Sequence, residues 1–176
     1  TLKYLPSSIL GRLEVHEQKR KVPVLDKKGN KNNNGIIIAG STDILSSLAT
    51  CCNPVYGEDI VGYITKGYGV KIHSKNCPNI DHSSERIIEA IWEENLENRY
   101  STKLKVYIED VGDILLQIIT LSTKSEIIID SINLINRNKE LFYDIKCRVK
   151  SINSLHNFID DVKLVPSVKE VERIFI

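Results

Sequence analysis

The sequence predicts an α+β protein in which a small β-rich cysteine domain (residues 35–80) precedes a domain with the order strand, helix, strand, strand, helix, strand (residues 99–176). The first half of this prediction rests on three of the four cysteines, which lie among closely spaced glycines between residues 51 and 77. The second half rests on apolar residues that alternate in some segments and recur at helical spacing in two others. A net charge of +1 and a hydrophobic fraction of 41% are typical of a globular protein, so contacts to nucleic acid must come from local patches.

Residues 1–34 are expected to form a helical tail and a disordered linker. Leu5, Ile9 and Leu13 recur at helical spacing. The run DKKGNKNNNG, which begins at Asp26, contains no apolar residue and cannot contribute to a packed core.

Four strands and one helical turn are predicted for the cysteine domain and for the segment that follows it. The strands are short apolar or alternating runs bounded by glycine, asparagine or serine. In chain order the elements are a buried strand at residues 35–40, a helical turn at 41–49, a hairpin at 59–65 and 70–73, and a strand at 86–92 within a linker at 81–98.

The spacing of the cysteines is typical of a zinc site. Cys51 and Cys52 are followed by twenty residues, then by His73, three more residues and Cys77. Structural zinc is commonly held by two such pairs that the fold brings together. Adjacent cysteines in an extended strand point to opposite faces, so both reach one metal only if the backbone bends. Free thiols in a small core are the alternative, and a disulfide is disfavoured because no signal peptide accompanies the chain.

The hairpin between the two ligand pairs carries three lysines and no acidic residue from Ile60 to Cys77. Lysines beside aromatic rings offer phosphate contacts and stacking surfaces, a combination that proteins use to bind looped RNA. A basic stretch is also typical of an ordinary solvated surface, so composition alone does not decide between the two. The candidate RNA-binding residues are Lys66, Tyr68, Lys71 and Lys75.

The stretch CCNPVYGEDIVGYITKGYGVKIHSKNCPN, which begins at Cys51, resembles the conserved-cysteine, ribosome-intersubunit domain of the long RelA/SpoT alarmone synthetase/hydrolases. The resemblance implies a zinc-finger-like domain that binds the ribosome, with 23S rRNA and tRNA as partners of the full-length protein. Lys66 and Tyr68 stand where the family commonly has arginine. Lysine keeps the charge but lacks the bidentate guanidinium, so contacts that depend on arginine are not expected at Lys66.

The second half of the chain has a different pattern, which is clearest between residues 141 and 150, where apolar and polar residues alternate strictly. Cys147 lies on the apolar side of this strand and is predicted to be a core residue. The expected elements are a strand at 103–108, a helix at 114–122, strands at 127–135 and 141–150, a helix at 152–162 and a strand at 168–175. This order within about 80 residues is the ferredoxin-like βαββαβ plan.

The ferredoxin-like half follows the cysteine domain directly and in this position resembles the ACT domain of RelA/SpoT enzymes. ACT domains generally bind a small amino acid at the loop after the first strand, often across a dimer interface. The resemblance therefore implies a homodimer and a site for a branched-chain amino acid. A glycine-containing loop at a helix start also exposes N–H groups suited to a carboxylate, although an ordinary helix start explains the same residues. The corresponding residues are Asp110, Val111, Gly112, Asp113 and Ile114.

No arrangement of residues typical of catalysis is present in the sequence, so the chain by itself is not expected to be an enzyme. The resemblance implies a parent that is a GTP pyrophosphokinase or (p)ppGpp 3'-pyrophosphohydrolase, whose catalytic domains lie N-terminal to this chain and are controlled by it. The main alternative is an amino-acid-sensing ACT homodimer with a purely structural cysteine cluster. With no apolar run long enough to cross a bilayer and no signal peptide, the expected location is the cytoplasm, away from the membrane.

Overall fold

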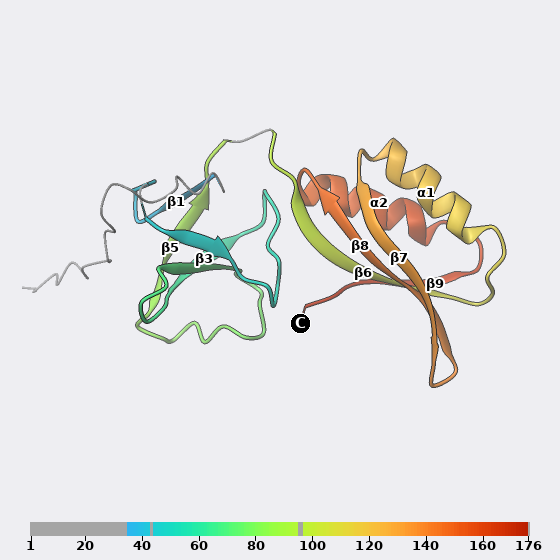
Figure 1. The fold of residues 1–176 in the computed structure, drawn as a ribbon, viewed down its shortest axis with the longest axis horizontal. Helices are drawn as coiled ribbons and strands as arrows, with labels where there is room; N and C mark the ends of the chain where they lie inside the picture. Colours follow the sequence, from blue (N-terminus) through green and yellow to red (C-terminus); the bar gives the residue numbers. More distant parts are fainter. Residues whose placement is uncertain (1–34, 43, 95–96, 176) are drawn as a thin grey trace, which may run out of the picture.

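Two β-sheets stand side by side in the computed structural model, and two helices lie on one face of the second sheet (Figure 1). The structure describes residues 35–42, 44–94 and 97–175. The helical tail and linker predicted for residues 1–34 lie outside the described residues. The arrangement confirms the predicted α+β class.

The first sheet contains five strands in the order β1-β5-β3-β4-β2. All its pairs are antiparallel except β2 with β4, which is parallel. The strand expected in the connecting segment, β5, is an interior strand that pairs with both β1 and β3. The strands are β1 (Ile36–Ile38), β2 (Ser46–Leu48), β3 (Ile60–Ile64), β4 (Val70–Ser74) and β5 (Ile87–Trp92).

One prediction for this sheet is wrong, because residues 41–49 do not form a helical turn. Residues 46–48 form β2, whose backbone pairs with β4 from Ser46 opposite Val70 to Leu48 opposite Ile72. Local preference for a helix start is weak, and the hydrogen bonds offered by the edge of β4 outweigh it.

The second sheet has the order β7-β8-β6-β9, with every neighbouring pair antiparallel. It realises the βαββαβ plan, and its two long central strands pair along their whole length. The elements are β6 (Tyr100–Ile108), α1 (Ile114–Lys124), β7 (Ile128–Arg137), β8 (Glu140–Val149), α2 (Ile152–Lys163) and β9 (Val168–Arg173). Neither α1 nor α2, the helices of the described part, is long and apolar enough to cross a membrane.

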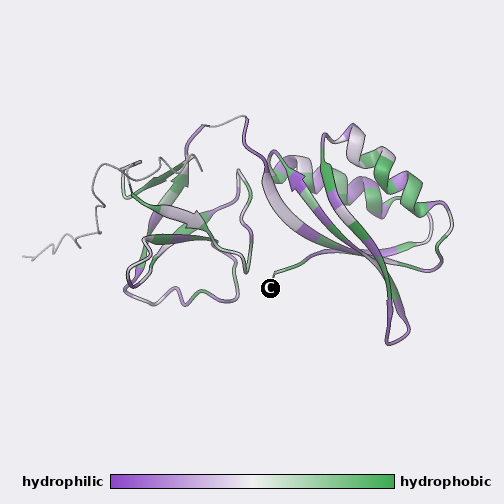
Figure 2. Ribbon diagram, in the orientation of Figure 1, coloured by the Kyte–Doolittle hydropathy of each residue, from purple (hydrophilic) through white to green (hydrophobic). Residues whose placement is uncertain are grey.

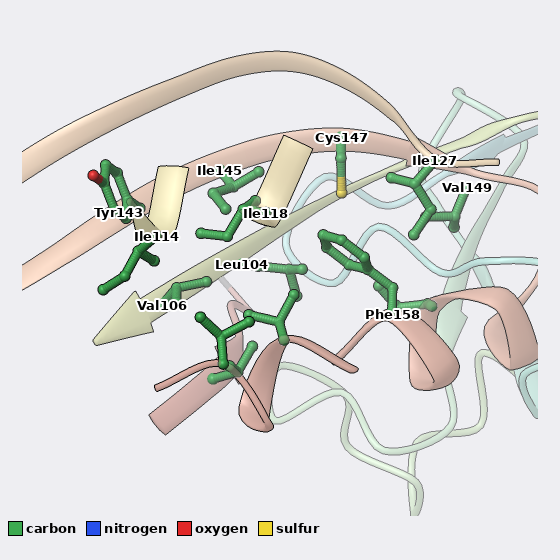
Figure 3. Close-up of a cluster of buried hydrophobic side chains, with 14 of the residues drawn as sticks. Leu104, Val106, Ile114, Ile118, Ile127, Tyr143, Ile145, Cys147, Val149 and Phe158 are labelled. Atoms are coloured by element: carbon green, nitrogen blue, oxygen red, sulfur yellow. The ribbon is translucent and has the colours of Figure 1, made fainter. Parts of the chain in front are cut away.

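The core of the second domain lies between the helices and the sheet (Figure 3). Every second residue of β6 and β8 points into it, and the Cys147 sulfur points toward Phe158, which confirms the prediction for this cysteine. On the other face of the sheet Phe142 is also buried, because Tyr107 and Lys105 cover it from the neighbouring strand.

Two details of the helices follow from local sequence. Ser151 caps α2 in a capping box with Ser154, which confirms the predicted helix start. Helix α1 is hydrophobic along much of its length (Figure 2), and only one side of it is buried. Leu115 lies away from the core and is 38% exposed, because Ile114 and Ile118 occupy the buried side.

The two domains share a packed interface. Val55, in the turn after the cysteines, is fully buried in the core cluster of the second domain. Tyr56 stacks on Tyr100 with a centroid distance of 6.4 Å, and Trp92 meets the Tyr100 ring edge-on at 5.0 Å. The backbone N–H of Ile152 donates to the Tyr56 carbonyl over 2.8 Å. Because these side chains pack into a shared core, they fix the orientation of the two domains relative to each other.

Candidate functional site

Four potential metal ligands gather at one end of the first sheet. The Sγ atoms of Cys51, Cys52 and Cys77 and a ring nitrogen of His73 all lie within 4.8 Å of one another. Cys51 Sγ is 3.4 Å from His73 Nδ1 and 3.6 Å from Cys77 Sγ, and Cys52 Sγ is 3.8 Å from His73 Nδ1. Ligands at Zn–S and Zn–N bond lengths in a tetrahedron are separated by about 3.5 to 3.8 Å, close to these three separations, so the set could hold a metal ion.

A bend in the backbone brings the adjacent cysteines to one side. The N–H of Asn53 donates to the carbonyl of Ala49 over 2.9 Å, which closes a single helix-like turn across both cysteines. Asn53 itself adopts a left-handed conformation with φ of +42°, a conformation that asparagine tolerates better than most residues. In this turn the adjacent cysteine side chains do not point to opposite faces, as they would in an extended strand, so both can reach one metal.

The second ligand pair is held by β4. His73 lies on this strand, and Cys77 follows it in a tight turn closed by its own N–H, which donates to the Ser74 carbonyl over 3.0 Å. The Ser74 N–H in turn donates to Cys52 Sγ over 3.4 Å, a bond that favours the thiolate form of Cys52. The strand and the turn that follows it therefore carry two ligands and support a third.

Burial favours the neutral forms of Cys52, His73 and Cys77. Desolvation raises the pKa of the Cys52 thiol to about 12 and also raises the pKa of Cys77. Burial, together with the nearby charge of Lys71, lowers the pKa of His73 below its usual value. The imidazole is thus available as a neutral ligand at pH 7, whereas the two thiols must release their protons to solvent before they can bind a metal.

The predicted RNA-binding residues lie along one hairpin, but not in a single patch. Lys66 and Tyr68 are in the turn between β3 and β4, where the Tyr68 side chain is 78% exposed. Lys71 lies half-buried on β4 opposite Tyr63, whereas Lys75 is exposed at the far end of that strand, beside the cysteine cluster. Five strand residues separate the two ends, a span of roughly 15 Å.

The predicted amino-acid-binding loop lies at the end of β6, on the second domain. Val111 and Gly112 are exposed, whereas Ile114 is buried in the core. Asp113 precedes α1 without capping it through its side chain. Asp110 accepts a hydrogen bond from Ser167 Oγ over 3.3 Å, which ties the loop to the segment before β9.

Sequence patterns did not identify Arg173, which lies at the edge of the cysteine turn. The Arg173 side chain reaches from the end of β9 to the carbonyl oxygens of Cys52 and Asn53 and pairs with the Glu58 carboxylate. No local pattern marks Arg173, because its partners in the first domain lie more than 110 residues away in the sequence.

Comparisons with known proteins agree with this two-domain arrangement. Residues 36–93 match the model of the RelA/SpoT RIS domain, and residues 96–173 match the model of an ACT domain. A GTP pyrophosphokinase from Escherichia coli is 25% identical over 82% of this chain and 20% of its own length, and one from Haemophilus influenzae is 28% identical over 84% and 21%. The ACT domain from the GTP pyrophosphokinase of Chlorobium tepidum matches 44% of this chain and its own whole length, with 22% identity and a TM-score of 0.38.

The fold and these matches define a regulatory unit in which a RIS domain is followed by an ACT domain. The chain belongs to the RelA/SpoT family and corresponds to its C-terminal regulatory region. It spans about a fifth of the length of the GTP pyrophosphokinases that it matches.

Proposed function

We propose that this chain senses the ribosome on behalf of a cytoplasmic (p)ppGpp synthetase/hydrolase, and that it biases the catalytic domains of that parent protein between synthesis and hydrolysis. The observation that carries this proposal is the RIS hairpin β3–β4, which presents basic and aromatic side chains and is anchored at its base by the four-ligand cluster. Regulation of this kind requires that the ribosome bind one conformation of the parent better than another.

The cluster would hold one zinc ion through Cys51, Cys52, His73 and Cys77. Three thiolates and one imidazole are a donor set typical of structural zinc, and the separations of their ligand atoms support the assignment. The ion would supply folding free energy, since a preformed site of this kind is absent from an unfolded chain. The contribution of the ion to ribosome binding is then indirect, because the ion holds the hairpin in place.

The hairpin would bind ribosomal RNA through charge and stacking. The exposed ring of Tyr68 offers a stacking surface next to Lys66, and Lys71 and Lys75 offer phosphate contacts farther along. Contacts at both ends of the hairpin fit a folded RNA surface better than a single flexible strand. The 23S ribosomal RNA, together with tRNA, is the partner that the family resemblance suggests.

Charge reversal in the hairpin tests this function. Lys66→Glu combined with Lys71→Glu should weaken association with purified ribosomes by at least about tenfold, because two phosphate contacts are replaced by repulsion. Cosedimentation at several salt concentrations would measure the loss and the reduced salt dependence. The matched control is Lys163→Glu with Lys169→Glu, which reverses two exposed lysines of the ACT domain. Equal ribosome binding by the hairpin variant and the unmodified chain would refute the RNA role of the hairpin.

A second candidate function, binding of a branched-chain amino acid by an ACT homodimer, is favoured by the start of α1. The helix has no side-chain N-cap, so no capping side chain occupies its first N–H groups, which are suited to bind a carboxylate. Titration calorimetry with valine and isoleucine tests this candidate, with Gly112→Val as the variant expected to lose binding. Absence of heat with both amino acids would eliminate it and leave the cysteine domain as the ligand-sensing part.

A further inference from the structure

The guanidinium of Arg173 joins the ACT domain to the turn that carries Cys51 and Cys52. After β9 the chain turns back toward the first domain (Figure 1). Arg173 Nη2 donates to the carbonyl oxygens of Asn53 over 2.9 Å and Cys52 over 3.4 Å. These are the last carbonyls of the helix-like turn, which have no acceptor role within it, and a cation at that end of a turn is stabilising.

The remaining contacts of Arg173 leave it little freedom. Nε donates to Thr102 Oγ1 over 3.1 Å, and Nη1 pairs with Oε1 of Glu58. The side chains of Arg173 and Glu58 are only 12% and 9% exposed. The other oxygen of Glu58 is buried with no hydrogen-bond partner among the described residues, so Arg173 is the principal compensation for this carboxylate. Such a planar group with partners on all three nitrogens cannot be reproduced by lysine.

We infer that Arg173 is a positioning residue for the candidate metal centre, and that metal occupancy and docking of the ACT domain stabilise each other. The inference rests on the proposed zinc site. Cys52 supplies one ligand atom, and its carbonyl and the next one are held by the ACT domain. A displacement of β9 would therefore displace Cys52. Conversely, a metal that holds the Cys52 side chain in place would also hold the Cys52 carbonyl, which accepts the hydrogen bond from Arg173. Coupling between two sites through one shared element is reciprocal.

With this arrangement, metal occupancy of the cysteine cluster would regulate how firmly the ACT domain is docked. Loss of the metal would loosen the seat of the ACT domain, and a ligand that shifts the ACT domain would weaken metal binding. The coupling passes through groups in direct contact, since Arg173 is the last residue of β9 and Asn53 directly follows the cysteine pair.

The first test is the zinc affinity of the Arg173→Lys variant of this 176-residue chain, measured by competition with a chromophoric chelator. Loss of the planar guanidinium should weaken zinc binding by about tenfold, the usual effect of losing an outer-shell partner of a metal ligand. The matched control is Arg148→Lys. Arg148 pairs with Asp130 at 2.8 Å within the ACT sheet, and its replacement should leave zinc affinity unchanged.

The second test needs no variant and reads the coupling from the other side. Zinc should slow hydrogen exchange of the Ile174 amide, which donates to the Lys103 carbonyl over 3.0 Å and reports the seating of β9. Two results together would overturn this inference and leave the proposed metal site intact. The first is that the unmodified chain and Arg173→Lys bind zinc with equal affinity, and the second is that zinc adds no protection at the Ile174 amide. Failure of the unmodified chain to bind zinc at all would overturn the proposed metal site, and the inference with it.

Discussion

At the scale of single residues, the candidate metal centre depends on four side chains. The cluster contains three thiols and one imidazole, and the Cys52 and Cys77 thiols are buried. Because burial raises their pKa values, both thiols are protonated at neutral pH and would release a proton to solvent when a metal binds. Metal binding is therefore linked to pH.

We predict about one zinc ion per chain in protein purified under reducing conditions, and little in Cys77→Ser. Because thiol protons must leave, zinc affinity should rise with pH between 6 and 8, by up to about tenfold per pH unit for each proton released. Cys147→Ala is the control, since this cysteine lies in the ACT core and should not affect zinc content. Metal analysis and chelator competition measure both quantities, and a flat pH dependence would contradict thiolate ligation.

At the scale of elements, the hairpin turn is fixed by a close approach between two backbones. Gly69 has φ of +74°, and a Cβ atom there would lie 2.3 Å from the Leu45 carbonyl oxygen. That carbonyl accepts the N–H of Val70 over 2.9 Å, so the turn is attached to the segment leading into β2. Gly67 has φ of +86°, but nothing lies within 4 Å of a Cβ at this position.

Gly69→Ala should lower the free energy of unfolding by about 2 to 4 kcal/mol, because left-handed strain and a backbone clash add together. Gly67→Ala should cost only the strain, about 1 to 2 kcal/mol. Urea denaturation monitored by far-UV circular dichroism measures both. Equal losses in the two variants would show that the contact with Leu45 does not constrain the turn.

At the scale of the whole molecule, the two domains are expected to unfold together. Val55 belongs to the first domain by sequence and to the core of the second by packing. Trp92, the single tryptophan, lies at this interface and donates from Nε1 to the Glu58 carbonyl over 2.9 Å. Its fluorescence therefore reports the state of the interface.

Val55→Ala should destabilise the chain by about 2 kcal/mol through lost burial and an unfilled cavity. Thermal unfolding followed by Trp92 fluorescence and by circular dichroism should remain a single coincident transition, lowered by about 4 to 8 °C. Val61→Ala, at a half-buried position on β3 outside the interface, should have a smaller effect. Two separate transitions in the unmodified chain would contradict cooperative unfolding of the domains.

Much of this fold could be predicted from the sequence because it depends on local periodicity. Alternation of apolar residues marks β6 and β8, and helical spacing marks α1 and α2. The four members of the cluster could be identified from residue type and spacing, since few chemistries need three thiols and an imidazole in that order.

Other features were decided only by tertiary structure, because they depend on partners distant in sequence. Residues 46–48 are a strand because β4 offers them hydrogen bonds, and Phe142 is buried because a neighbouring strand covers it. The cysteine turn bends at Asn53, and Arg173 reaches it from the last strand. A sequence pattern records the preferences of neighbouring residues, whereas these contacts exist only after the chain has brought two distant segments together.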